Sequence, residues 1–512
     1  MRQERLPLPL GEGWGEGYMQ KTKIIATIGP ASEKANTLKK MILAGMDVAR
    51  LNMSHRDHAY HLVLLKNIRE VATSLNRPVA IILDLQGPKI RTGQVAKEGI
   101  AVKKGDQVVL IPENSNVSAK ASYLYIPIQF PRLYKYAKTG QTIYIDDAAI
   151  ELKVVRVKRK TIECQVINDG VIKSKRGLNL PGANIKCPSL SAKDLADLEF
   201  GIKNKVDFVA LSYVSNEQDV LKLRKYILKL EKKFGFKSVD FKKLVEPGKW
   251  SGVHTRIISK IERPDAVKNF DKILEASDAI MIARGDLGIE IPLEDLPLIQ
   301  KGMINKCLRV SKPVIVATQM LNSMITKPYP TRAEVSDVAN AILDGTDAIM
   351  LSGETASGKY PIKTIKVMDK IARETEPAEI NKIIEDKSAK KILSTTRATA
   401  RNCQKLAEES NAKVIICTTT SGFTARIISS LKPRQKIIAL SPSEITQRQL
   451  NLSWNIFPYL FKKMGSFDKF ITDVKQLVIK EKIAKAGETI IICSSHPLGY
   501  QGQTNLIKIE IL

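Results

Sequence analysis

Several features of secreted and membrane proteins are missing from this sequence of 512 residues. No apolar run approaches the roughly 20 residues that a bilayer-spanning helix needs, and the first 18 residues lack the apolar core of a signal peptide. The six cysteines form neither a CxxC pair nor a metal-binding spacing, which argues against a structural zinc site and a disulfide framework. We therefore expect no membrane contact and a location in the reducing cytoplasm.

Acidic residues are also scarce, with 53 against 81 basic residues and a net charge of +28. Such an excess can indicate nucleic-acid binding, but the lysines are spread along the chain and no basic motif is interleaved with aromatic residues. We therefore expect a general preference for anionic ligands and no specific nucleic-acid binding.

The order of predicted elements indicates an α/β protein with several domains. Strands and helices alternate in residues 19–92 and again in 188–373, which together hold eight apolar strands and predict a (β/α)8 TIM barrel. Residues 93–187 hold short alternating runs such as QVVLIP and TIYIDD, typical of an inserted all-β domain. Residues 374–512 begin a further α/β unit, which predicts a separate C-terminal domain.

Three local segments carry their own predictions. Residues 1–18 are rich in proline and glycine and are expected to be a disordered extension, with Met19 as an alternative start. Residues 234–254 are expected to be a surface insertion of no inferable function. Residues 32–45 are predicted to form a helix capped by Ser32 and closed by a glycine.

Residues 257–291 are typical of a βαβ unit, in which a right-handed crossover lays two strands parallel. Lys260 and Glu262 end the first strand and Asp286 follows the second, so all three are expected at the carboxyl edge of the barrel. Two carboxylates suit Mg²⁺, which takes its other ligands from a phosphorylated substrate, and the lysine would face the same phosphate.

Two glycines follow the second strand of this unit. Gly285 and Gly288 are expected to leave backbone N–H groups uncovered, and the turn that follows them could open a helix whose amino end attracts an anion. A surface salt bridge beside a glycine turn is the structural alternative for the whole stretch.

Polar residues also follow other predicted strands of the barrel. Each alone has a structural explanation, such as a salt bridge or a helix cap, but their joint placement on one face favours phosphoryl transfer, which relies on positioning and charge neutralisation. These residues are Arg50, Asn52, Ser54, Asp84, Arg91 and Thr318.

Three histidines follow the second strand at a spacing that metal ligands can also show: His55, His58 and His61. The segment after this strand is predicted to be a helix. We therefore expect His58 and His61 to lie on the surface of that helix rather than to bind a metal.

Long motifs make the chain resemble the pyruvate kinase family from Lys21 to the C-terminus. The resemblance implies a (β/α)8 barrel, a small β-barrel lid domain inserted after its third strand, a C-terminal regulatory α/β domain and a homotetramer. It also implies phosphoryl transfer from phosphoenolpyruvate to ADP, giving pyruvate and ATP. The motifs are KIIATIGPAS, VARLNMSH, GPKIRTG, GLNLPG, IISKIE, IARGDLGIEIP, ATQML and PTRAEVSDVANAILDGTDAIMLSGETASGKYP.

The resemblance implies a role for each matching position in the chemical step. Glu262 and Asp286 would hold Mg²⁺, for which Mn²⁺ can substitute. Lys260 would stabilise the moving phosphoryl group and the developing enolate, and Arg50 would grip the phosphoryl oxygens. Thr318 stands where the family protonates the enolate through water.

The resemblance also implies how the substrates are held. The backbone of Arg284, Gly285 and Asp286 would receive the substrate carboxylate. Arg176, on the lid, is often lysine in relatives. The positions that match the nucleotide side are Asn52, His55, Arg91 and Arg176.

One departure from the family concerns the monovalent cation. Members that require K⁺ carry glutamate where this chain has Lys89, and Thr-Lys where it has Leu85 and Gln86. Because a fixed ammonium can replace a mobile cation electrostatically, we expect that K⁺ is not required. The pocket that would have held K⁺ uses Asn52, Ser54, Asp84 and the Leu85 carbonyl.

Residues 418–424 of the C-terminal domain resemble the family's effector phosphate loop, with Thr419, Ser421, Gly422 and Thr424 as candidate ligands. The basic residues frequent in that loop are absent, so fructose 1,6-bisphosphate is not the expected effector. Another sugar phosphate or a nucleotide stays open, and a polar turn at a helix start is the structural alternative.

Two rival functions also stay open from the sequence alone. A Mg²⁺-dependent aldolase or lyase on a related barrel pairs Glu and Asp around an enolate, but it needs neither the lid nor a nucleotide-side arginine such as Arg91. A basic scaffold or RNA-binding protein that has lost catalysis is the second rival, and the intact Lys260, Glu262 and Asp286 argue against it. ADP-dependent pyruvate formation distinguishes these functions.

Overall fold

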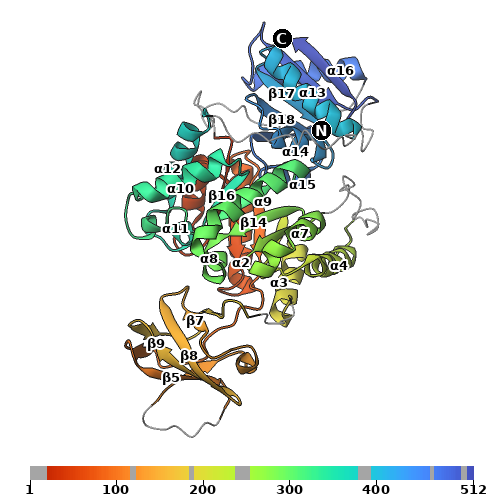
Figure 1. Ribbon diagram of the computed structural model, residues 1–512. Helices are drawn as coiled ribbons and strands as arrows, with labels where there is room; N and C mark the ends of the chain where they lie inside the picture. The colour runs from red at the N-terminus through yellow and green to blue at the C-terminus, as the bar shows by residue number, and fades with distance from the viewer. Residues whose placement is uncertain are drawn as a thin grey trace.

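The computed structural model describes most of the chain as three regions, with a barrel between a smaller sheet domain and a C-terminal α/β domain (Figure 1). The extension predicted at residues 1–18, Met19 and most of the segment 234–254 lie outside the described residues. The described residues are 20–115, 123–183, 189–236, 254–378, 394–461, 466–497 and 504–512.

Eight parallel strands form a closed barrel in the order β1, β16, β15, β14, β13, β12, β3 and β2, which confirms the predicted fold class. The strands are rich in β-branched and other apolar residues because both of their faces are covered. Their bounds are β1 Lys23–Thr27, β2 Met46–Asn52, β3 Ala80–Asp84, β12 Phe208–Leu211, β13 Arg256–Ile261, β14 Ala279–Ala283, β15 Val314–Ala317 and β16 Ala348–Leu351.

Helices surround the barrel on its outer side (Figure 1). None of the helices among the described residues has both the length and the apolarity that crossing a membrane requires. Their bounds are α1 Ala35–Leu43, α2 His58–Ser74, α3 Ala192–Lys203, α4 Glu217–Lys233, α6 Pro264–Lys268, α7 Phe270–Ala276, α8 Arg284–Glu290, α9 Leu296–Val310, α10 Arg332–Leu343, α11 Gly353–Ala356 and α12 Pro361–Thr375.

The predicted cap of the first helix is wrong. Helix α1 begins at Ala35, and its N-cap residue Lys34 makes no side-chain cap. Ser32 is instead buried in the turn before the helix, where its hydroxyl accepts a hydrogen bond from the N–H of Gly29 at 3.0 Å. A serine can satisfy a nearby turn as readily as a helix end, so the residue type alone did not decide between the two.

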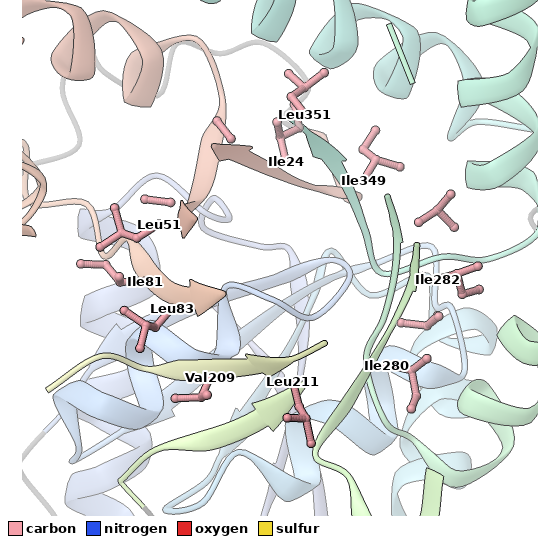
Figure 2. Packing of buried hydrophobic residues seen from close by; sticks show 14 of the residues in the cluster. Ile24, Leu51, Ile81, Leu83, Val209, Leu211, Ile280, Ile282, Ile349 and Leu351 are labelled. Atoms are coloured by element: carbon pink, nitrogen blue, oxygen red, sulfur yellow. The ribbon is translucent and has the colours of Figure 1, made fainter. Parts of the chain in front are cut away.

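Alternate residues of each strand serve two separate hydrophobic cores, as the pleat of a strand requires. One core lies between the strands and the helices, and Figure 2 shows part of it: Ile24, Leu51, Ile81, Leu83, Val209, Leu211, Ile280, Ile282, Ile349 and Leu351. The other fills the barrel interior and includes Ile25, Val48, Ile82, Ile258, Met281, Met350 and one residue of the C-terminal domain, Leu452.

The inserted domain is built on a six-stranded sheet in the order β11, β7, β8, β9, β5 and β6, beside a two-stranded sheet of β10 and β4. It packs around its own buried cluster, which includes Val108, Ile143 and Leu152. Its strands are β4 Ile100–Val102, β5 Gln107–Pro112, β6 Leu124–Ile128, β7 Thr142–Ile145, β8 Ile150–Lys158, β9 Thr161–Val166, β10 Gly170–Ile172 and β11 Leu178–Asn179.

The C-terminal domain has a five-stranded sheet in the order β19, β18, β17, β20 and β21, of which only the pairing of β20 with β21 is antiparallel among its described strands. It packs against the amino-terminal ends of the barrel strands, where Arg448 forms a 2.8 Å ion pair with Asp207 just before β12. Its elements are β17 Val414–Thr418, β18 Lys436–Ser441, β19 Ile456–Leu460, β20 Thr489–Ser494, β21 Leu506–Ile511, α13 Thr395–Glu409, α14 Phe423–Ser430, α15 Glu444–Leu450 and α16 Phe467–Lys480.

Candidate active site

The predicted cluster lies at the carboxyl ends of the barrel strands, opposite the C-terminal domain. Lys260 is the penultimate residue of β13 and Glu262 follows that strand. Asp286 lies in the first turn of α8, directly after β14, and Thr318 follows β15. The sequence therefore placed these four residues at the correct strand ends.

Lys260 is the centre of the cluster. Its Nζ lies 2.8 Å from Glu262 Oε1, 3.3 Å from Asp84 Oδ1 and 2.8 Å from the hydroxyl of Ser212. Burial alone would lower the pKa of Lys260, but Asp84 and Glu262 outweigh it and raise the pKa above its usual value. The ammonium is therefore charged at neutral pH and fixed in place.

Arg50 forms a second fixed cation beside Lys260. Both its Nε and its Nη2 lie 2.7 Å from Asp84 Oδ2, and its Nη1 donates to the hydroxyl of Thr27 at 2.9 Å. Burial alone would raise the pKa of Asp84, but the positive charges of Lys260 and Arg50 outweigh burial, so the pKa is lowered. An ionised Asp84 thus holds two cations at the barrel mouth.

Glu262 and Asp286 lie on neighbouring strand ends and are held by different donors. Glu262 Oε2 accepts from the backbone N–H of Tyr213 at 2.6 Å. Asp286 Oδ1 accepts from Lys89 Nζ at 2.8 Å and from the Tyr213 hydroxyl at 3.2 Å. Burial raises the pKa of Glu262, whereas Lys89 and Lys260 overcome burial and lower the pKa of Asp286.

The two carboxylates fit a divalent cation of the Mg²⁺ type. The hydrogen bonds to Asp286 fall on Oδ1, and Oδ2 has no hydrogen-bond donor among the described residues. Over that same part of the chain, no group of three or more His, Cys, Asp or Glu side chains could hold a metal. A pair of carboxylates that leaves the other positions to substrate and water is the arrangement Mg²⁺ favours.

Thr318 contacts the segment that was expected to bind a carboxylate. Its Oγ1 accepts from the N–H of Gly285 at 2.7 Å, so this N–H is not uncovered as predicted. Thr318 and Gln319 both have positive φ, at 70° and 55°, which non-glycine residues rarely adopt outside functional or strained sites. Arg284 donates to the Thr318 carbonyl at 3.0 Å and stabilises this turn.

The residues predicted on the nucleotide side approach the same mouth from β2 and from the inserted domain. Arg91 forms a bridge with Gly177 of that domain, next to Arg176. Burial, and then the positive charges of Arg91 and Arg50, lower the pKa of His55. Its imidazole is therefore neutral at pH 7.

The residues predicted for a K⁺ pocket have partners of their own. Asn52 Oδ1 accepts from the N–H of Ser54 at 3.1 Å, and the Leu85 carbonyl accepts from the Ser212 hydroxyl at 2.7 Å. Lys89 forms an ion pair with Asp286 rather than with the residues predicted for the K⁺ pocket. The Nζ of Lys89 also lies 3.5 Å from Asp147 of the inserted domain. The Lys89 ammonium is thus fixed within the site, next to the candidate metal ligands.

The expectation for the histidines is half wrong. His58 is partly exposed, stacks on Phe200 and lies 2.7 Å from Asp197. His61 is buried with 2% of its surface exposed, and its Nε2 lies 2.9 Å from the His55 carbonyl. His61 lies three and four residues before Leu64 and Leu65, so all three side chains are on the same buried face of α2, which packs on the barrel.

The predicted effector loop joins β17 to α14. Gly422 has φ of +80°, and a Cβ there would lie 2.9 Å from Leu450, so the turn requires glycine. Thr419 and Thr424 are buried, and the hydroxyl of Thr424 lies 2.6 Å from that of Thr504. Two of the four candidate residues, Thr419 and Thr424, are therefore buried in the domain.

The loop also contacts the barrel. The carbonyl of Ser421 accepts from Arg256 Nη2 at 2.6 Å and from Arg426 Nη1 at 3.2 Å. Arg256 is the first residue of β13, the strand that carries Lys260. Backbone of the loop is thus bonded directly to a strand of the candidate active site.

Sequence reasoning missed Ser212 and Tyr213, which follow β12 and contact Lys260, Glu262 and Asp286. The sequence did contain a signal for them. Polar site residues were predicted after the second, third, fifth, sixth and seventh barrel strands, but none was predicted after the fourth strand, β12. A serine and a tyrosine carry no formal charge, so they did not stand out beside arginines and carboxylates.

Comparisons with known proteins agree with this geometry. Residues 19–365 match the family model of the pyruvate kinase barrel domain, and residues 397–510 match that of the pyruvate kinase alpha/beta domain. The chain is 40% identical over 498 residues to a pyruvate kinase of Clostridium acetobutylicum, covering 96% of this chain and 100% of the relative. It is 40% identical over 496 residues to a pyruvate kinase of Geobacillus stearothermophilus, covering 96% and 80%.

A solved structure leads to the same assignment. A pyruvate kinase from Cryptosporidium parvum superimposes with a TM-score of 0.85 at 36% sequence identity, and 96% of each chain is covered. Together with the two family models, this match extends over the barrel, the inserted domain and the C-terminal domain. The chain belongs to the pyruvate kinase family.

Proposed function

We propose that the side chains at the barrel mouth carry out the reaction of this family, the phosphoryl transfer from phosphoenolpyruvate to ADP that gives pyruvate and ATP in glycolysis. The observation that carries the proposal is the fixed Lys260 ammonium, held 2.8 Å from Glu262 and 3.3 Å from Asp84. A cation that needs no reorganisation stabilises negative charge as it develops on a transferred phosphoryl group and on the enolate oxygen.

Arg50 and Lys260 divide the work of charge neutralisation. Asp84 anchors Arg50 through two contacts of 2.7 Å, so the guanidinium can bind phosphoryl oxygens without losing its orientation. Lys260 lies on β13, three strands along the barrel from β2, which carries Arg50, and it would face the bond that breaks. In the balanced reaction the phosphoryl group moves to a terminal oxygen of ADP and the enolate takes a proton at carbon.

Glu262 and Asp286 would hold the divalent cation, Mg²⁺ or Mn²⁺ in its place. When bound, this cation supplies positive charge that neutralises substrate oxygens. The chain's own part is to keep the two carboxylates adjacent, which Lys89, Lys260 and Tyr213 support through the contacts described above.

Thr318 would direct the proton that converts the enolate to pyruvate. Its hydroxyl already contacts the N–H of Gly285, in the segment of Arg284, Gly285 and Asp286 to which the substrate carboxylate is assigned. The strained φ of 70° at Thr318 supports a functional role because such a conformation persists only where its surroundings enforce it. A water between this hydroxyl and the enolate carbon would deliver the proton.

The nucleotide would lie between the barrel mouth and the inserted domain. Asn52, His55, Arg91 and Arg176 would border this region. The bridge between Arg91 and Gly177, next to Arg176, supports this proposal because two positive charges suit a polyphosphate. Lys89 would supply the charge that other family members take from K⁺, so we infer that K⁺ is not required.

Three further properties follow as proposals from family membership. We infer a homotetramer and a cytoplasmic location, and the five described cysteines are free and buried, as a reducing compartment permits. For Thr419, Ser421, Gly422 and Thr424 we propose a phosphorylated effector, a sugar phosphate or a nucleotide. Binding would rest mainly on Ser421 and on backbone groups, because Thr419 and Thr424 are buried.

A direct assay tests the function. Purified protein should release pyruvate from phosphoenolpyruvate only when both ADP and Mg²⁺ are present, and it should form one ATP for each pyruvate. Chelation of the divalent cation should stop the reaction, and added Mg²⁺ or Mn²⁺ should restore it. Pyruvate release without ADP would point to a lyase or phosphatase instead.

A further inference from the structure

Tyr213 has an unusual backbone conformation at the edge of the active site. It follows β12 after Ser212 and has φ of +56°, in the left-handed region that bulky residues rarely adopt. Such a conformation is unfavourable and is retained where surrounding contacts fix it. The contacts that fix Tyr213 are made with the two candidate metal ligands.

One residue bridges both carboxylates. The Tyr213 N–H donates to Glu262 Oε2 at 2.6 Å, and its hydroxyl donates to Asp286 Oδ1 at 3.2 Å. Glu262 follows β13 and Asp286 follows β14, so these bonds join the ends of three strands, β12, β13 and β14. Among the described residues, only Tyr213 forms hydrogen bonds to both carboxylates in this way, with its hydroxyl to Asp286 and its backbone N–H to Glu262.

The oxygens that Tyr213 contacts matter for a metal. On Asp286 its hydroxyl shares Oδ1 with Lys89, and on Glu262 its N–H takes Oε2 while Lys260 takes Oε1. Donors on one oxygen of Asp286 fix the rotation of the carboxylate and direct the other oxygen to a ligand. A phenol does this without adding a charge, whereas a second ammonium would compete with the cation.

We propose that Tyr213 is a positioning residue of the divalent-cation site, which sets the spacing and rotation of Glu262 and Asp286 through its N–H and its hydroxyl. The inference rests on the proposed function, because it takes these two carboxylates as the metal ligands. Tyr213 does not contact the reacting atoms in this scheme. Its effect should therefore appear in metal affinity before it appears in turnover.

The test removes the hydroxyl and keeps the ring. In Tyr213→Phe, the dissociation constant for Mn²⁺, measured without substrates from the electron paramagnetic resonance signal of free Mn²⁺, should rise about 10-fold or more. The Mg²⁺ concentration that gives half-maximal activity should rise in parallel, and kcat at saturating Mg²⁺ should change much less. This split between metal affinity and turnover is not expected from a merely structural tyrosine.

Tyr60→Phe is the matched control. Its hydroxyl also donates to a carboxylate, that of Glu33 at 2.6 Å, but this bond lies outside the site. The control should bind Mn²⁺ as the unmodified protein does. Crystals of Tyr213→Phe soaked with Mn²⁺ give a second readout that does not depend on stability, since the Asp286 carboxylate should rotate about its Cβ–Cγ bond.

Glu262→Gln separates the possible failures. If Glu262→Gln loses Mn²⁺ binding while Tyr213→Phe keeps normal affinity and an unrotated Asp286, the positioning role of Tyr213 is wrong and the metal site stands. If Glu262→Gln binds Mn²⁺ normally, the metal site itself has been misplaced, and the role of Tyr213 is overturned with it.

Discussion

The ammonium of Lys89 lies 2.8 Å from Asp286 Oδ1, although the two residues are 197 positions apart in the chain. Lys89 comes from the segment between β3 and the inserted domain, whereas Asp286 lies in the first turn of α8. Burial would lower the pKa of Lys89, but Asp286 outweighs it and raises the pKa, so the ammonium stays charged. A permanent cation is therefore part of this active site.

The first prediction concerns potassium. Because Lys89 supplies a fixed positive charge, adding KCl to an assay buffered with a bulky counter-ion should change the rate less than about two-fold. Lys89→Glu reverses that charge and should lose most activity without K⁺ and regain part of it with K⁺. Strong activation of the unmodified enzyme by KCl would contradict the prediction, and Lys103→Glu, on an exposed residue of the inserted domain, is the control.

A second prediction concerns the catalytic cation. Lys260→Met keeps an unbranched side chain that is one atom shorter but removes the charge between Asp84 and Glu262, so kcat should fall by about 100- to 1,000-fold or more while the protein stays folded. Circular dichroism would verify the fold, and steady-state kinetics would give kcat. Lys268→Met, on an exposed lysine of α6, should be fully active. A near-normal rate for Lys260→Met would remove Lys260 from the mechanism.

Much of this site was predictable because a parallel barrel brings the carboxyl ends of its strands together. Apolar runs identified the strands, and the polar residue after each run identified the site, as for Lys260 and Asp286. Details that depend on contacts between distant segments were not predictable. The partner of Lys89 and the positive φ of Tyr213 arise from packing across three strands, which no local pattern encodes.

The surroundings of single side chains were the other feature that the sequence did not predict. His61 carries a polar ring, yet it faces the barrel because its position on α2 matches that of Leu64. Leu452 is an ordinary apolar residue of the C-terminal domain by sequence, yet it belongs to the interior cluster of the barrel. In both residues the tertiary surroundings, not the residue type, decided the environment.

A third prediction concerns pH and stability. Burial raises the pKa of Glu231, on α4, from 4.5 to about 7, against the N–H of Thr255 that favours the ionised form. Between these two values Glu231 binds a proton in the folded protein that the unfolded chain has released. The contribution of Glu231 to stability is therefore fully present below pH 4.5 and is lost as pH rises toward about 7. The loss should be of the order of 3 kcal/mol.

Glu231→Gln tests this effect because glutamine can still accept from Thr255 but does not ionise. Between pH 5 and 8 the variant should gain stability relative to the unmodified protein, and the difference should level off above about pH 8. Nearby His254 is present in both proteins, so its titration cancels in the comparison of their melting temperatures. Glu409→Gln, on the exposed surface of α13, should show no such trend.

The last prediction concerns the contact between the C-terminal domain and the barrel. Leu452 is fully buried in the same cluster as Ile258 and Met281, whose strands carry Lys260 and lead to Asp286. Leu452→Ala leaves a cavity at the amino-terminal end of the barrel and should lower stability by about 2–5 kcal/mol. Hydrogen exchange at the amides of β13 and β14 should accelerate, because Ile258 and Met281 on these strands lose their packing against Leu452. Leu298→Ala, at a side chain 75% exposed, is the control. Equal melting temperatures and exchange rates for the two variants would show that the C-terminal domain does not stabilise the amino-terminal end of the barrel.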